Sequence, residues 1–264
     1  WRALAPAIPL ADRAAPAERA AAMGVLSNLA LVDLYGAIDA ADDMPAVLSA
    51  TASDLRSAYA GADVATRLGA LRQLWEGGST SQGEYARLIL TARAAARVRP
   101  IDGKDEADRI IAAMLSAGMD RTAMRWRDTV STGTDGWALL MLADPDAATR
   151  LGYGAVSGYA SARKQQIFFA GLAGLGRLSS SDIERGAQAF DVKIGADNAW
   201  TRALDRATRD RQPATVLLLS AIGMQTGDWR GVPPEMLYRI VTALRVVGLG
   251  GEARMIATEA LTRA

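Results

Sequence analysis

The final stretch of the chain, from Pro233 to Ala264, carries the pattern of two helices joined by a tight turn. Proline suits the first turn of a helix, where its missing N–H would have no partner, and apolar side chains then recur at helical spacing. Gly248 interrupts this pattern, since glycine readily adopts the left-handed conformation that closes a helix. A second helical pattern follows so closely that the two helices must be antiparallel neighbours.

A related spacing occurs earlier in the chain. The segment Met114–Ala123 places a glycine, an apolar residue and an alanine where Leu244–Ala253 has them, and Leu219–Met224 matches in part. The intervals between these segments are unequal, so no fixed repeat period is present. We therefore predict an irregular α-solenoid of stacked antiparallel helix hairpins, with a compact multi-helix bundle as the alternative.

The composition also favours an all-α protein. The chain has 264 residues, of which 50% are hydrophobic and 54 are alanine, the best helix former. Runs of β-branched and aromatic residues, which are typical of strands, are scarce. This length and apolar content suffice for one large or two modest domains.

The order of turn residues predicts how the chain is divided. Residues 1–15 carry two prolines among alanines and are expected to form an extended arm, with Pro16 starting a first helix that runs to Asp39. Residues 16–264 are expected to form one all-helical, repeat-like domain, with a weak boundary near residues 100–104. The segment Pro213–Ile222 is apolar on most sides, which predicts a central helix.

Charge and missing residue types exclude several function classes. The formal net charge is +1, so we expect no nucleic-acid partner. The chain has no histidine and no cysteine, which removes imidazole bases, thiol nucleophiles and the commonest metal ligands. We therefore expect no metal and no cofactor, and an enzyme is disfavoured.

Localisation is only weakly indicated. No apolar run approaches the roughly 20 residues that a transmembrane helix requires. The abundance of alanine and arginine suggests a bacterial protein, and a sequence that starts at Trp1 rather than Met is consistent with a removed signal peptide. A periplasmic or cytoplasmic location is expected, with a lean to the periplasm.

One short motif resembles that of an enzyme family. Ile222-Gly223-Met224-Gln225 is similar to the Gly-Leu-Met-Gln box of lytic transglycosylases, which are helical glycan-cleaving enzymes. The resemblance implies a general-acid glutamate shortly upstream, but residues 198–222 contain no glutamate. A helix-ending glycine followed by an apolar residue explains the match without catalysis.

Two groups of residues are candidates for an interaction surface. Arginines at the end of one predicted helix form the least compensated basic stretch, and two tryptophans lie beside arginines or in a glycine-flanked loop, a combination typical of binding hot spots. These candidate residues are Arg87, Arg93, Arg97, Arg99, Trp126 and Trp229.

Together these features favour a non-catalytic helical-repeat scaffold or protein–protein interaction module that binds another, unidentified protein. The alternatives are a carboxylate-dependent, glycan-cleaving enzyme of the cell envelope and an anion-binding module that uses the Arg87–Arg99 face. The oligomeric state is not predicted.

Overall fold

The computed structural model describes residues 1–146, 148–159, 162–227 and 229–264. Its secondary structure is helical throughout these ranges, without a strand, so the all-α fold class is confirmed. The chain divides into two compact units, unit 1 with Trp1–Thr129 and unit 2 with Val130–Ala264. Each unit has its own central helix.

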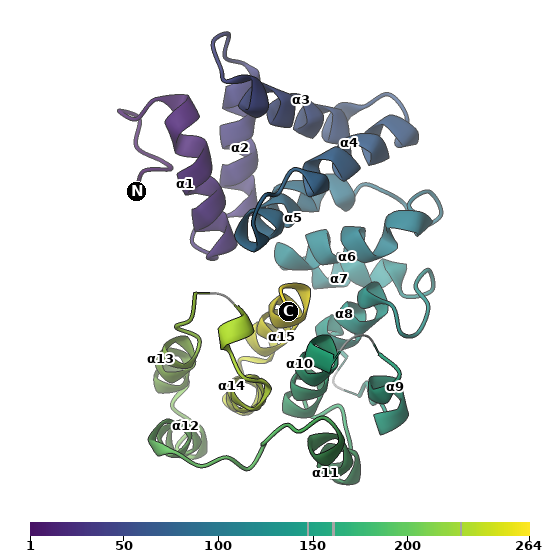
Figure 1. Ribbon diagram of the computed structural model, residues 1–264, viewed down its shortest axis with the longest axis vertical. Helices are drawn as coiled ribbons and strands as arrows, with labels where there is room; N and C mark the ends of the chain where they lie inside the picture. Colours follow the sequence, from purple (N-terminus) through teal and green to yellow (C-terminus); the bar gives the residue numbers. More distant parts are fainter. Residues whose placement is uncertain (147, 160–161, 228) are drawn as a thin grey trace. The chain divides into compact units, whose positions relative to one another are not determined.

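Unit 1 begins with five helices that are joined by short turns (Figure 1). They are α1 (Leu10–Ala22), α2 (Asn28–Asp39), α3 (Ala46–Ala60), α4 (Val64–Glu76) and α5 (Ser81–Ala95). A 3₁₀ turn (Lys104–Glu106), α6 (Ala107–Ser116), α7 (Asp120–Ala123) and a second 3₁₀ turn (Met124–Trp126) follow. The turn at residues 100–104 therefore lies inside unit 1, between α5 and α6.

Helix α5 is the centre of unit 1. It packs against α1, α2, α3, α4 and α6, and it is buried on nearly all sides because it presents alanine to several neighbours. Ala86, Ala92, Ala94 and Ala95 are each at most 1% exposed. Small side chains let helix axes approach closely, which is how one helix can contact five others.

The start of the chain differs from the prediction. Helix α1 begins at Leu10, so residues 10–15 are helical and Pro16 lies inside the helix rather than at its start. A buried stripe of Ala14, Ala17 and Ala21 continues through the proline, and this packing against α2 and α5 outweighs the proline's lost hydrogen bond. The predicted first helix is in fact two helices, because Gly24 adopts a positive φ of 71° between them.

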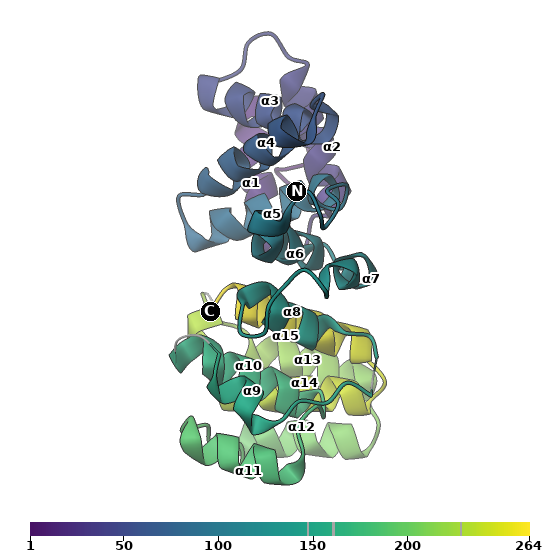
Figure 2. The ribbon, with the colours of Figure 1, turned by 90° about the vertical axis from the view of Figure 1, so that its right-hand side faces the viewer.

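Unit 2 starts with α8 (Asp135–Ala143), α9 (Tyr153–Ser157), α10 (Ala162–Gly174) and α11 (Ser180–Ala189). It continues with α12 (Ala199–Arg209), α13 (Pro213–Gly223), a 3₁₀ turn (Trp229–Gly231), α14 (Pro234–Val246) and α15 (Gly250–Thr262). Helices α10 and α12 to α15 run roughly alongside one another, nearly end-on in Figure 1 and lengthwise in Figure 2.

Helix α10 is the centre of unit 2. It packs against α8, α9, α14 and α15, and every residue from Ile167 to Gly174 is buried. Gly174 allows the closest of these contacts, since a Cβ atom there would lie 2.8 Å from Val241 and 3.0 Å from the main-chain oxygen of Tyr238. Helix α14 can therefore sit directly on the backbone of α10.

The predicted C-terminal hairpin is confirmed as α14 and α15. Gly248 has a φ of 92°, and the N–H of Leu249 donates to the main-chain oxygen of Leu244 at 2.8 Å, which closes α14. Gly118 ends α6 in the same way, with a φ of 71°. Gly223 does not, because its missing side chain instead makes room for the indole of Trp200 on α12.

We predict that Gly174→Ala destabilises the protein although alanine favours helices. The new methyl group would overlap Val241 and the backbone of α14, and overpacking of this kind costs about 1–3 kcal/mol. Gly69→Ala in α4 is the matched control, since a Cβ atom there meets nothing within 4 Å and should leave stability unchanged or raised. Urea unfolding measures both variants, and equal effects would contradict the assignment of Gly174.

Candidate functional site

The four candidate arginines do not share one surface. Arg87 is only 8% exposed and points into unit 1, whereas Arg93, Arg97 and Arg99 are exposed. Arg93 and Arg97 are one turn apart on α5 or just beyond its end and lie on the same side. The structure therefore brings together two of the four.

Arg87 belongs to a buried polar cluster between α1, α2 and α5. Its guanidinium lies 3.2 Å from Glu18 Oε1 and 5.7 Å from the centre of the Tyr35 ring. The Tyr35 hydroxyl donates to the same Glu18 oxygen at 2.5 Å. Burial raises the pKa of Tyr35, so its proton stays available for this hydrogen bond. The cluster compensates a buried charge and holds three helices together.

Arg93 and Arg97 lie close to a tyrosine hydroxyl. The Arg93 Nε–H donates to Asn28 Oδ1 at 3.1 Å, and neither arginine has a carboxylate partner among the described residues. Tyr59 on α3 has a buried hydroxyl oxygen without a hydrogen-bond partner in the same part of the chain. Burial raises the pKa of Tyr59, and the charges of Arg93 and Arg97 oppose this shift. The charges of Arg93 and Arg97 thus act on a buried hydroxyl of α3, a helix that packs against α5.

The remaining candidates are separate from this pair. Arg99 forms an exposed ion pair with Asp102 at 2.6 Å. Trp126 is 1% exposed and fills the core of unit 1, so it is a core residue rather than a surface one. Trp229, in unit 2, is half-buried, and its indole N–H donates to Glu259 Oε1 at 3.1 Å.

Helix α13 is where the sequence prediction is wrong and where the most unusual surface lies. The sequence predicts a central helix, but α13 lies at the edge of unit 2, and its main contacts among the described residues are with α12 and α14 (Figure 1). Val216 and Ser220 are buried, whereas Leu217, Leu218 and Ile222 are 45%, 62% and 47% exposed. The helix has two apolar sides, and only one of them is covered.

The exposed side of α13, here called the outer stripe, comprises Ala214, Leu217, Leu218, Ala221 and Ile222. These positions follow the i, i+3, i+4, i+7, i+8 spacing that helices normally bury. No charged residue occurs between Pro213 and Gly227, but a buried helix would show the same pattern, so the sequence alone does not identify an interface here.

The backbone at the N-terminal end of the outer stripe is strained. Arg211 has a φ of 52°, a left-handed conformation that costs a residue with a side chain about 1 kcal/mol or more and glycine almost nothing. It closes α12, because the Gln212 N–H donates to the main-chain oxygen of Ala207 at 2.9 Å. An exposed arginine therefore occupies a position where glycine would be more stable.

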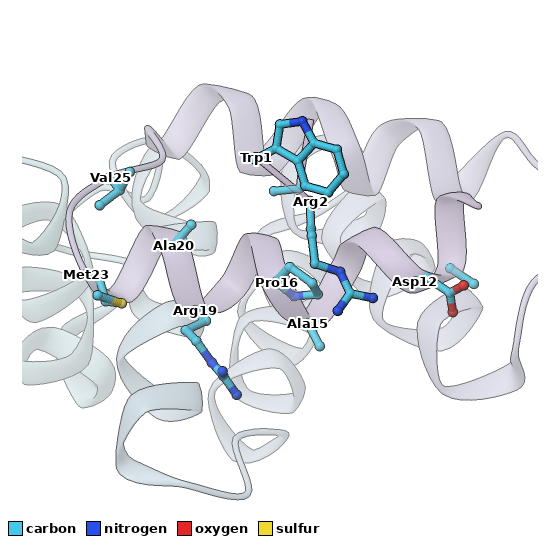
Figure 3. A pocket seen from close by; sticks show the side chains of 11 residues that line it. Trp1, Arg2, Asp12, Ala15, Pro16, Arg19, Ala20, Met23 and Val25 are labelled. Carbon is cyan, nitrogen blue, oxygen red and sulfur yellow. The ribbon is translucent and has the colours of Figure 1, made fainter. Parts of the chain in front are cut away.

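A cavity of about 700 Å³ lies between the N-terminal residues and α1 (Figure 3). Its polar lining consists of Arg2, Arg19 and a single carboxylate, Asp12, and its walls include Trp1 and Met23. Glycoside hydrolysis generally uses two carboxylates that face each other. This cavity supplies one.

Asp144 is the one acidic residue below 9% exposure in the described part of the chain. Its carboxylate accepts from the Thr149 hydroxyl at 2.7 Å and from the Asp146 N–H at 2.9 Å. Beside it, Arg177 donates to the main-chain oxygens of Met141 and Asp144, and burial lowers the pKa of Arg177 to about 10. The arginine stays charged at neutral pH, so this group fixes the end of α8.

No protein-family model, curated protein or solved structure matches the chain. None of the described helices is long and apolar enough to cross a membrane. Within the same residues there is no group of three or more carboxylates that could hold a metal ion.

We predict that Glu18→Gln destabilises unit 1 by about 3 kcal/mol, because it leaves the charge of Arg87 buried without its partner. Asp102→Asn, which breaks the exposed pair with Arg99, is the control and should have no measurable effect. Urea unfolding followed by circular dichroism measures both variants. A Glu18→Gln variant with the same free energy of unfolding as the wild type would show that the cluster does not hold α1, α2 and α5 together.

Proposed function

We propose that this chain is a non-catalytic helical protein that binds a partner protein through the outer stripe of α13. One observation carries the proposal: a charge-free apolar stripe with core-like spacing is left exposed on an edge helix. The largest apolar patch on a monomeric protein commonly measures a few hundred Å² and is often a binding site. Recognition of one helix by another uses this i, i+3, i+4, i+7 pattern.

The size of the stripe suits a specific but modest interface. Leu217, Leu218 and Ile222 together expose on the order of 300 Å², and covering this area would contribute about 7 kcal/mol before the entropic cost of association. The flanking alanines add little area but allow a partner helix to approach closely. Binding of moderate affinity is therefore expected.

The polar groups of the chain support a binding role over catalysis. Both oxygens of the buried Asp144 carboxylate accept hydrogen bonds, and the cavity beside α1 is lined by one carboxylate. A glycan-cleaving enzyme needs a protonated acid and a second carboxylate across the sugar. The outer stripe requires no such chemistry.

We predict that a photo-crosslinking amino acid at Ala221 captures a protein in the cells that produce this chain. Leu218→Lys should abolish capture, since it places a charge in the apolar contact. The same crosslinker at Val47, an apolar residue in α3 that is 76% exposed, is the matched control. Absence of any product at Ala221, or an equal yield at Val47, would overturn the proposed function.

A second candidate function is anion binding at Arg93 and Arg97. The specific observation that favours it is the Tyr59 hydroxyl on α3, the helix that packs against α5, because this hydroxyl is buried and has no hydrogen-bond partner in the described residues. An anion held by both guanidinium groups could accept a hydrogen bond from this hydroxyl. The partner would be a phosphate, sulfate or carboxylate group.

We predict for this second function that the protein is retained on a polyanion matrix and that salt weakens retention. Arg93→Ala/Arg97→Ala should abolish retention, and Tyr59→Phe should reduce it. Arg202→Ala/Arg206→Ala, another exposed pair with four-residue spacing, is the control. Unchanged retention of the Arg93/Arg97 variant would exclude anion binding at this place.

A further inference from the structure

We propose that the outer stripe of α13 is covered by α13 of a second copy of this chain, in an antiparallel pair whose two-fold axis passes beside Leu218. This inference rests on the proposed function and names its partner. It is drawn from the order of large and small residues in the stripe, from the arginines before its N-terminal end, and from the strain at Arg211.

The order of large and small residues in the outer stripe makes it complementary to a second copy of itself that runs in the opposite direction. Ala214 and Ile222 are equally distant from Leu218, so an antiparallel copy places Ala214 opposite Ile222 of the second copy. Leu218 then lies opposite its own equivalent. A small residue thus faces a large one at each end of the contact, which is the arrangement that lets facing helices interdigitate.

Alanines set the spacing of this pair. Ala214 and Ala221 are one heptad apart and are both exposed, with Leu218 between them. Interaxial distance depends on the side chains at the contact, so alanines at this interval allow two helices to approach closely. Leu217 and Ile222, on the two flanks of the stripe, would then cover the sides of the contact.

The charged residues before the N-terminal end of α13 favour the antiparallel direction. Arg209 and Arg211 are exposed at the N-terminal end, where the partial positive charge of a helix disfavours cations. In an antiparallel pair these arginines lie beside the C-terminal end of the other helix, where the partial negative charge of the helix dipole attracts cations. The carbonyl oxygens of Ser220, Ala221 and Ile222 at that end already accept main-chain hydrogen bonds. A parallel pair would instead bring together two Arg209–Arg211 segments, each with a net charge of +1 because Asp210 lies between the arginines.

The strained backbone at Arg211 fits the same arrangement. Asp191 closes α11 with a similar φ of 51°, but aspartate tolerates this conformation better than arginine does. The Arg211 side chain is exposed, and no hydrogen bond or ion pair involving it is present in the described residues. A contact between Arg211 and the second copy would explain why arginine occupies this position, although glycine would relieve the backbone strain.

The stripe itself carries no charged group that could select a different protein. Its exposed area lies well below the roughly 800 Å² per partner of standard stable complexes, so the dimer should be weak, with a dissociation constant on the order of 10–100 µM. The self-association should therefore depend on concentration and resist added salt.

Sedimentation velocity of the full chain between about 1 and 500 µM tests the proposal. We expect a monomer–dimer equilibrium for the wild type. Leu218→Asp and Leu218→Lys should each be monomeric throughout, because like charges meet at the two-fold axis. An equimolar mixture of the two variants should regain dimers, since the opposite charges then face each other. Val47→Lys should behave as the wild type.

The Arg211→Gly variant distinguishes an effect on dimerisation from an effect on folding stability. The variant should unfold at a higher temperature, because the left-handed strain is gone, and should dimerise at least threefold more weakly. A wild type that is monomeric at every concentration overturns the proposal. So does a dimer that persists in Leu218→Lys, or a mixture of the Asp and Lys variants that stays monomeric.

The crosslinking experiment at Ala221 distinguishes this inference from the proposed function. A crosslinked dimer of the chain supports both. A crosslink to a different protein, together with a monomeric wild type in sedimentation, overturns the second copy as partner and leaves the proposed function standing. No crosslink and no dimer overturn both.

Discussion

Close packing around two helices with small residues is the constraint on which the structure depends. Helix α5 in unit 1 and helix α10 in unit 2 are each surrounded by other helices, and alanine or glycine makes this possible. Each added methyl group at these contacts would push a neighbouring helix outward, since protein interiors have little free volume. The high alanine content therefore has a structural role beyond helix propensity.

The same packing explains the buried charges. A helix that is covered on nearly all sides must bury some polar residues, and each then needs a partner. Arg87 on α5 is paired with Glu18 and stacked over Tyr35, and Arg177 after α10 is held by main-chain oxygens at the end of α8. These groups join helices that are distant in sequence, and they stay within the core of their own unit.

Much of the fold could be predicted from the sequence because it depends on local signals. The C-terminal hairpin follows from helical spacing and from Gly248. Arg87 precedes Arg93 by six residues, which places the two side chains about 240° apart around a helix. Arg87 therefore lies on a different side of α5 from the exposed Arg93, and its burial could have been inferred as well. The start of α1 could not, because the tertiary packing of its alanines outweighs the local signal of Pro16.

The outer stripe of α13 could not be assigned from periodicity. A helix with two apolar sides looks the same in sequence whether both sides meet the same chain or one meets a partner. Only the fold, which leaves Leu217, Leu218 and Ile222 exposed, separates these cases. Among the exposed apolar residues of unit 1, Trp1, Met23 and Val25 line the cavity beside α1, whereas Val47 and Ile101 lie on separate segments.

The most direct test of this account is carbene footprinting of the full chain at low and high protein concentration. Labelling of Leu217, Leu218 and Ile222 should fall as the protein concentration rises, because the second copy covers them, while labelling of Val47 should not change. Labelling of the outer stripe that is constant over the whole concentration range would contradict the claim that a second copy covers α13.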